Sequence, residues 1–568
     1  MAPGGENQMK FSQIPYERPD MAKILEGAAA LVAGVKSAAN VPEIMEHYEK
    51  FKEVYKTMYT LGALVYIRHS LDTKDEFYDK ENDFFDQNNP IIQKLAIDFY
   101  REMVASKHRA GAEKELGEKW FNDAELRLKG FDDSIIEEMQ KENALCSKYD
   151  KLLASASLEF DGKKNNLSQL RAYQLSPDRE VRKAAYAKRT EFFIENEKEL
   201  DELFDELVKL RHSMALKLGF DNYIKLGYVQ MHRNSYDADT VKRFRDQVKK
   251  HLVPFLAKMH EQRRQNLEID KLKFFDEDIY FASGNPTPKG TPDEMFEAGT
   301  KMYDELSAET KEFFDFMLES ELFDVLAREG KSGGGYCHFL PDYGTPFVFA
   351  NFNGTSEDVD VLTHECGHAL ASYLARDIEI VEYQDYTSDV AEIHSMAMEF
   401  FTAGWMKHFF KEDTDKYLYM HLASALAFIP YGCTVDEFQH IIYENPDMTP
   451  AERKAAWKKL EMEYKPHLDY DGDPFFGNGG HWQRQTHIYE RPFYYIDYCL
   501  AQTCAIQYRL WMETNKSAAW KSYIDLMKKA GTRIFTDLTN EAGLKSPFEN
   551  GCIEAIVTGA SELLNNLK

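Results

Sequence analysis

The stretch TSEDVDVLTHECGHALASY, residues 355–373, contains the pattern His364-Glu365-Cys366-Gly367-His368. Positions i and i+4 of a helix lie about 40° apart on one face, so the two histidines can present their imidazoles to one metal ion. Glu365 is displaced by one position, so it can reach a water molecule on that ion without binding the ion itself, as a general base requires. The stretch therefore predicts a zinc-binding helix.

The ends and the apolar positions of this stretch support a helix. Thr355, with Asp358 three residues later, can form a start that resembles a capping box. Residues at helical spacing supply an apolar stripe for packing, namely Val359, Leu362, Cys366, Leu370 and Tyr373. Cys366 belongs to this stripe, so we interpret it as a small buried hydrophobe.

A catalytic zinc site needs three protein ligands and an open position for water. No His-x-x-Gly-x-x-His continuation follows His368, which argues against the three-histidine arrangement of metzincins. Glu392 lies in a helical-looking run from Asp389 to Glu399, and we predict that it is the third ligand. Asp389 is the alternative; it ranks lower because only Glu392 begins the pattern Glu-x-x-Ser-x-x-x-Glu.

Two further carboxylates could orient the histidine ligands. On the helix of the third ligand, Ser395 and Glu399 share the face of the metal, whereas His394 points elsewhere. Asp360 lies one turn before His364. A carboxylate that hydrogen-bonds a metal-binding histidine fixes its ring. We expect this role for Glu399 and Asp360, with a solvated charge as the alternative.

The stretch from Gly477 to Tyr498 is dense in possible hydrogen-bond donors, which are His481, His487, Tyr489, Tyr494, Tyr495 and Tyr498. Such donors stabilise the oxyanion that forms when water attacks a carbonyl. Tyr494 and Tyr498 lie at i and i+4, so a helix would place both hydroxyls on one side. An aromatic helix packed in the core is the alternative interpretation.

Helical periodicity dominates the rest of the chain, from about residue 20 to about 157 and again after Ser176-Pro177. An Asp161-Gly162 turn signal separates these runs. We predict an N-terminal helical lobe over residues 1–170 and a catalytic domain over residues 171–568.

Two short β-like runs, at Tyr336–Leu340 and Phe347–Asn351, precede the metal-binding helix. The predicted fold class is therefore mainly α with a small β element.

Composition excludes several partners. The 96 acidic and 69 basic residues of the 568-residue chain give a net charge of −27, which would repel nucleic acid. No stretch approaches the roughly 18 uninterrupted apolar residues of a membrane span. Residues 1–20 lack a signal or transit pattern, and the seven scattered cysteines suggest reduced thiols. We expect a cytoplasmic protein without nucleic-acid or membrane partners.

These motifs resemble the oligoendopeptidase F and thimet oligopeptidase family of zinc peptidases, and most of all its bacterial oligoendopeptidase F and Pz-peptidase branch. The resemblance covers roughly residues 170 to 560. It rests on His364-Glu365-x-x-His368, on Glu392-x-x-Ser395-x-x-x-Glu399, and on His487-x-Tyr489 followed by Phe493-Tyr494 and Tyr498.

The resemblance implies one zinc ion per chain, with Glu365 as the base and with the ligands His364, His368 and Glu392. It also implies that His487 and Tyr498 bind substrate and stabilise the transition state. The tyrosine spacing departs from that of the thimet branch, so the choice among Tyr494, Tyr495 and Tyr498 stays open.

The family's fold is a mostly helical ellipsoid with zinc at the floor of a deep cleft, which implies an endopeptidase that accepts short peptides and excludes folded proteins. The run Phe347–Asn351 would be a cleft-edge strand that pairs with extended substrate, or a buried strand that covers the metal-binding helix. Two functional alternatives remain, a dipeptidyl carboxypeptidase with the same site and a non-catalytic helical protein that binds peptides. The oligomeric state stays open.

Overall fold

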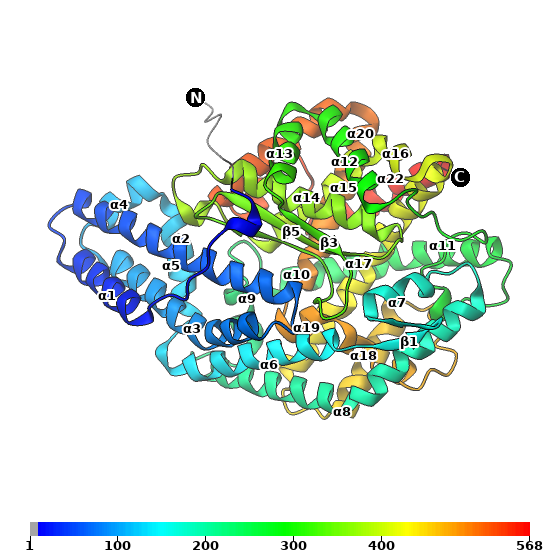
Figure 1. The fold of residues 1–568 in the computed structure, drawn as a ribbon, viewed down its shortest axis with the longest axis horizontal. Helices are drawn as coiled ribbons and strands as arrows, with labels where there is room; N and C mark the ends of the chain where they lie inside the picture. The colour runs from blue at the N-terminus through cyan, green and yellow to red at the C-terminus, as the bar shows by residue number, and fades with distance from the viewer. Residues whose placement is uncertain (1–8, 568) are drawn as a thin grey trace.

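The computed structural model describes residues 9–567 and is mainly helical, with two small sheets (Figure 1). The segment in which we found no targeting pattern, residues 1–20, lies partly outside this range. The predicted run of N-terminal helices is confirmed. Its members are α1 (Met21–Ser37), α2 (Val41–Leu71), α3 (Glu76–Ala105), α4 (Arg109–Leu116), α5 (Glu118–Lys129) and α6 (Ile136–Ala154).

A two-stranded hairpin, β1 (Leu158–Phe160) and β2 (Lys163–Asn165), follows these helices. Asp161 and Gly162 at its tip both have positive φ, 54° and 70°, as a two-residue type I′ turn requires. The Asp-Gly signal therefore identified the turn correctly, while the domain boundary near it stays a prediction. The next helices are α7 (Leu167–Gln174), α8 (Arg179–Lys217), α9 (Tyr223–Gln230), α10 (Ala238–Gln247), α11 (Val253–Asn266), α12 (Pro292–Leu306) and α13 (Ala308–Glu319).

The second sheet has the order β3-β5-β4, with β3 (Phe323–Leu326) parallel and β4 (Tyr336–Leu340) antiparallel to β5 (Thr345–Phe352). The expectation that Phe347–Asn351 forms a cleft-edge strand is therefore wrong, because both of its backbone edges are already paired. The alternative is confirmed: β5 is buried and packs against the helix that carries the His-Glu-x-x-His pattern. The two outer edges of the sheet belong to β3 and β4.

That helix, α14 (Glu357–Ala375), packs against α15 (Ser388–Phe401) in the middle of the molecule (Figure 1). Gly367 allows the close crossing, since a Cβ atom there would lie 2.5 Å from the carbonyl oxygen of His394. The glycine inside the motif thus brings the two halves of the predicted metal site together.

The start of α14 differs from the predicted capping box. Ser356 precedes the helix without a side-chain cap, and the hydroxyl of Thr355 donates to the side chain of Asn353. The Asp358 carboxylate instead accepts hydrogen bonds from the backbone N–H groups of Asn353 and Gly354. The N–H groups that donate to Asp358 thus belong to the entry loop and not to the first turn of the helix, where we expected the cap.

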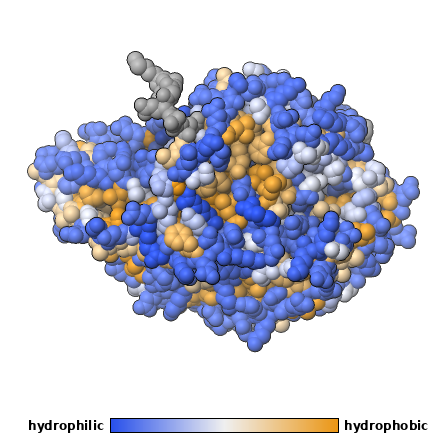
Figure 2. Space-filling model, viewed as in Figure 1, coloured by the Kyte–Doolittle hydropathy of each residue, from blue (hydrophilic) through white to orange (hydrophobic). Residues whose placement is uncertain are grey.

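The remaining helices are α16 (Lys407–Phe410), α17 (Thr414–Glu444), α18 (Pro450–Tyr464), α19 (Thr486–Glu490), α20 (Tyr495–Lys529), α21 (Phe535–Glu541) and α22 (Cys552–Asn566). Within the described residues, only the stretch Lys407–Glu444 is long and apolar enough to cross a membrane. Inside the protein, 72% of its most apolar window is buried, as expected for a core helix. On the face shown in Figure 2, hydrophobic residues gather near the centre and hydrophilic residues surround them.

Candidate active site

Three side chains from α14 and α15 converge in the way that a metal site requires. Nε2 of His364 lies 3.3 Å and Nε2 of His368 lies 3.4 Å from the same carboxylate oxygen of Glu392. Their possible ligand atoms all lie within 4.8 Å of one another. Across residues 9–567, no second cluster of three or more His, Cys, Asp or Glu side chains meets this geometry.

A carboxylate behind this group holds one of the histidines. Glu399 is 2.7 Å from Nδ1 of His364, which leaves Nε2 of that ring to face Glu392. The other Glu399 oxygen is 2.7 Å from Nε2 of His421 on α17. The expected contact of Glu399 with His364 is confirmed, while the ligand role of His364 stays a prediction. Sequence reasoning missed His421, because no local pattern connects it to either motif.

Asp360 has no hydrogen bond or ion pair with His364 or His368, contrary to our expectation. Its carboxylate accepts a hydrogen bond from the hydroxyl of Tyr417 on α17. Burial raises the pKa of Asp360 to about 7. Asp389, the alternative third ligand, is also directed elsewhere, since it accepts hydrogen bonds from Tyr236 and from the backbone N–H of Val390.

Glu365 is 5% exposed, and its Oε2 atom is buried without a hydrogen-bond partner among residues 9–567. Burial raises the pKa of this carboxyl group, against the opposing charges of His364 and His368. An unsatisfied buried carboxylate costs folding free energy, so its place beside the metal-binding group calls for a functional explanation.

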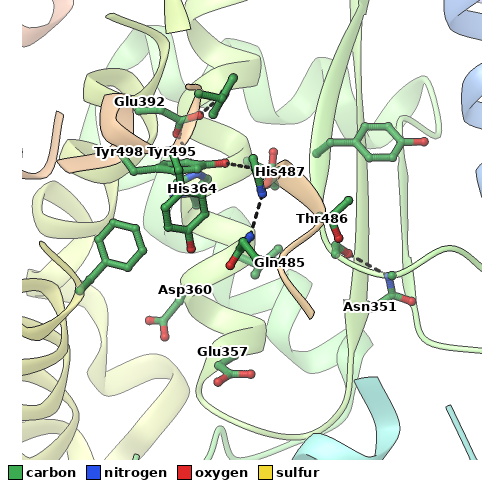
Figure 3. A pocket seen from close by; sticks show the side chains of 18 of the residues that line it. Asn351, Glu357, Asp360, His364, Glu392, Gln485, Thr486, His487, Tyr495 and Tyr498 are labelled. Atoms are coloured by element: carbon green, nitrogen blue, oxygen red, sulfur yellow. Dashed lines mark hydrogen bonds and ion pairs between the residues drawn. The ribbon is translucent and has the colours of Figure 1, made fainter. Parts of the chain in front are cut away.

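The segment after Gly477 supplies a second group of polar side chains. Nε2 of His487 lies 3.1 Å from the hydroxyl of Tyr498, and Nδ1 lies 2.9 Å from the amide of Gln485. Figure 3 shows His487 joined to both, with His364 and Glu392 on the Tyr498 side. Burial lowers the pKa of His487 to about 4, so its imidazole is neutral near pH 7.

The three candidate tyrosines have different surroundings. Tyr494 donates a hydrogen bond to Oε1 of Glu392, and its ring lies 5.3 Å from that of Tyr498. Tyr495 contacts His487 through its ring, at 5.1 Å between centroids. Tyr498 alone pairs its hydroxyl with His487.

Two other candidates of the same segment lie away from the metal-binding group. Tyr489 stacks on Tyr149 at 3.9 Å and donates to the backbone of Leu200 in the core. His481 hydrogen-bonds the carboxylate of Glu461 at 2.7 Å. For Tyr489, the core-packing alternative is therefore the correct interpretation.

One cavity of about 1170 Å³ is lined by His364, Glu365, His368, Glu392, Glu399, His421, His487 and the three candidate tyrosines, but not by Asp389 or Tyr489. Its walls include residues of helices α2, α7 and α8, of the edge strand β4, and of the segment from His481 to Tyr498. The cavity brings together residues that are far apart in the sequence, and it holds both the metal-binding group and its neighbouring donors.

The fold and this site define a metalloendopeptidase in which helix α14 carries the His-Glu-x-x-His pattern. The chain belongs to peptidase family M3. A model described as peptidase family M3 matches residues 172–558, and one described as the peptidase M3 N-terminal domain matches residues 11–131. The protein is therefore an enzyme that hydrolyses peptides.

Relatives agree with this membership. Oligopeptidase PepF of Bacillus subtilis (strain 168) is 24% identical over 585 aligned residues, which cover 94% of this chain and 82% of the relative. The oligoendopeptidase F homolog of Borreliella burgdorferi is 24% identical over 468 residues, covering 76% and 77%. The solved structure of a Pz peptidase A with an inhibitor is similar with a TM-score of 0.97 and 47% identity, covering 98% of this chain and 99% of that one. The predicted resemblance and the mainly α fold are confirmed.

Proposed function

We propose that this protein is a zinc-dependent oligoendopeptidase that hydrolyses internal bonds of short peptides with Glu365 as its general base. One observation carries the proposal: the unpartnered, buried carboxylate of Glu365 shares a cavity with three converging metal ligands and with the His487–Tyr498 pair. The names of the relatives, oligopeptidase and oligoendopeptidase, support the choice of short peptides.

The donor set fits zinc. Two imidazole nitrogens and one carboxylate oxygen, from His364, His368 and Glu392, are the ligands of many catalytic zinc sites. Glu399 already engages Nδ1 of His364, so Nε2 is the atom left to bind the metal. A zinc ion bound there would polarise the scissile carbonyl and lower the pKa of water.

The protein's own side chains would then move the proton and stabilise charge. Glu365 accepts the proton of the attacking water and returns it to the leaving amine, and its raised pKa suits a group that must hold that proton in between. His487 and Tyr498 donate hydrogen bonds to the developing oxyanion. The pKa of Tyr498 is raised by burial, so its hydroxyl keeps its proton near pH 7.

The shape of the cavity supports selection for extended peptides. The open edge of β4 lines it, with Tyr336, Cys337 and His338 along the wall. An extended peptide can add to such an edge through backbone hydrogen bonds, whereas a folded domain cannot enter a cavity of about 1170 Å³. The cytoplasmic location stays a prediction.

The test is the substitution Glu365→Gln, which keeps the size of the side chain and removes its basicity. We expect the turnover of a quenched fluorescent peptide with blocked ends to fall by about 10²–10⁴-fold, while the zinc content per chain stays unchanged. Glu379→Gln, at an exposed position just after α14, is the control and should behave as the wild type.

Near wild-type turnover of Glu365→Gln would refute the assignment of the base. The blocked ends also separate the proposal from its rival. A dipeptidyl carboxypeptidase would leave such a peptide intact, whereas an endopeptidase cleaves it, and mass spectrometry of the products locates the cleaved bond.

A further inference from the structure

The cavity extends past the metal-binding group to an end that is rich in cations. Arg189 on α8 and Arg484, in the turn His481–Arg484, both line it. We call these two residues the arginine end. Within residues 9–567, neither guanidinium has an ion pair with a carboxylate; their hydrogen bonds go to Gln174 and His481.

Two neighbouring cations of the same cavity, Arg171 and Lys465, do have carboxylate partners. Arg171 pairs with Glu357 at 2.7 Å and with Asp278 at 2.8 Å. Lys465 pairs with Glu277 at 2.5 Å. The carboxylates of Glu357, Asp278 and Glu277 are thus engaged by other cations and are not the counter-ions of the arginine end.

Both guanidinium groups have N–H donors that are not used in hydrogen bonds within the described residues. Arg189 donates from one terminal nitrogen to Gln174 at 3.3 Å, and its Nε atom is buried without a partner in the described part of the chain. Arg484 uses Nε to donate to His481 at 2.7 Å and lies over the ring of Tyr431. Each planar group therefore has N–H donors available, in the fork that matches a carboxylate.

Electrostatics at this end also favour an anion. Burial and then the charge of Arg484 lower the pKa of Arg189 to about 10. A lowered pKa means that the surroundings oppose the charged form of the side chain. A carboxylate placed between the two groups would remove this penalty, because it supplies the missing opposite charge.

The direction of the edge strand indicates which end of a peptide reaches the arginines. Ahead of β4, Ser332 donates to Asp150 on α6, whereas after β4 the backbone N–H of Asp342 donates to Thr60 on α2. The backbone N–H of Ser332 also donates to Ser70 of α2, so the strand runs along α2 from Ser70 to Thr60, with α6 beside its first end. A peptide paired antiparallel to β4 runs the opposite way, so its C-terminus points to the side of α6 and the following helices, α7 and α8.

We propose that the arginine end binds the free α-carboxylate at the C-terminus of the substrate, with Arg189 and Arg484 as its two donors. This inference rests on the proposed peptidase function and names its substrate class: peptides that end a few residues beyond the cleaved bond. Arg484 is three residues from His487, a chain distance of at most about 10 Å, so the C-terminal piece between these two side chains would span at most about three extended residues.

An acidic side chain of the substrate would present the same carboxylate chemistry, so the test uses three peptides of one sequence. The first ends in a free acid, the second in an amide, and the third in an amide with Glu as its last residue. Values of kcat and KM are measured for the wild type, Arg189→Gln and Arg484→Gln. Arg243→Gln, an exposed arginine on α10 outside the cavity, controls for the loss of one charge.

For the wild type, we expect the free acid to exceed the amide in kcat/KM by about tenfold or more, mainly through KM. Each cavity variant should lose most of this preference and keep its rate on the amide, while Arg243→Gln keeps the preference. Equal kcat/KM for acid and amide in the wild type overturns the proposal, and so does a preference that survives in both variants. Equal preference for the Glu-amide and the free acid also overturns it, because the site would then recognise a side chain.

A binding measurement separates this proposal from the proposed chemistry. The Kd of the free acid and of the amide is measured on Glu365→Gln protein by calorimetry. Tighter binding of the free acid, lost in the double variant with Arg484→Gln, supports the arginine end even if no peptide is hydrolysed. Equal Kd values overturn it, whatever the activity of the wild type.

Discussion

The centre of the cavity and its arginine end differ in how charge is balanced. At the centre, His364 lies between two carboxylates, Glu392 and Glu399, and the second of these also holds His421. At the arginine end, Arg189 and Arg484 form no ion pair with a carboxylate of the described residues. The centre thus suits a bound cation, and the arginine end suits a bound anion.

This difference suggests a division of roles within one cavity. Residues at the centre would catalyse hydrolysis, and residues at the arginine end would bind the substrate. Groups at the centre should change turnover or metal content when they are replaced, because they touch the reacting atoms or the metal. Groups at the arginine end should change KM and leave the chemical step alone. The following substitutions test the roles of the groups at the centre.

The largest effect is expected for Glu392→Ala. The variant should lose its metal and at least about 10³-fold of its peptide turnover, because two histidines alone hold zinc weakly. Asp389→Asn, on the same helix, is the matched control and should keep one metal ion per chain. Metal analysis beside an activity assay decides, and metal retained by Glu392→Ala but lost by Asp389→Asn would reverse the ligand assignment.

A smaller loss is expected for Tyr498→Phe. Removal of one oxyanion donor should lower kcat by about 10²-fold with little change in KM or in metal content. Tyr489→Phe removes a hydroxyl from the same segment that bonds only core backbone, so it should leave kcat unchanged. If both variants lost kcat equally, the hydroxyl of Tyr498 would be structural and the contrast within this segment would fail.

The smallest effect is expected for Glu399→Gln, which weakens the hydrogen bond to His364 but keeps all three ligands. Metal affinity should fall by about 10- to 100-fold in a competition with a chelator. Asp360→Asn is the control, because Asp360 contacts Tyr417 instead of a ligand. It should change metal affinity by less than about threefold. An equal loss in both variants would contradict the specific role of Glu399.

Several features were predictable from the sequence because they depend on local spacing. The pairing of His364 with His368, the helix that carries Glu392, and the Asp161-Gly162 turn each follow from one helix or one hairpin. The structure has all three elements. A pattern of period 3.6 or a turn dipeptide carries its own geometry, so no distant contact is needed to recognise it.

Other features failed because the deciding partner lies far away in the sequence. Phe347–Asn351 was expected at the cleft edge, but the unpredicted strand β3 pairs with one side of β5 and β4 with the other. His421 meets Glu399 only because α17 packs against the site. Thr355 did not cap α14, because Asn353 captures its hydroxyl.

The sequence by itself thus determined the helices, the candidate metal ligands within them and the family of the enzyme, since these rest on residue spacing along single elements. Only the tertiary structure decided which carboxylate faces His364, which tyrosine meets His487, and which edge strand lines the cavity. It also decided that two arginines share one end of the cavity without an ion pair to a carboxylate. The physical reason is that charge balance and hydrogen bonding depend on distance in space, and residues hundreds of positions apart come into contact only when the chain packs.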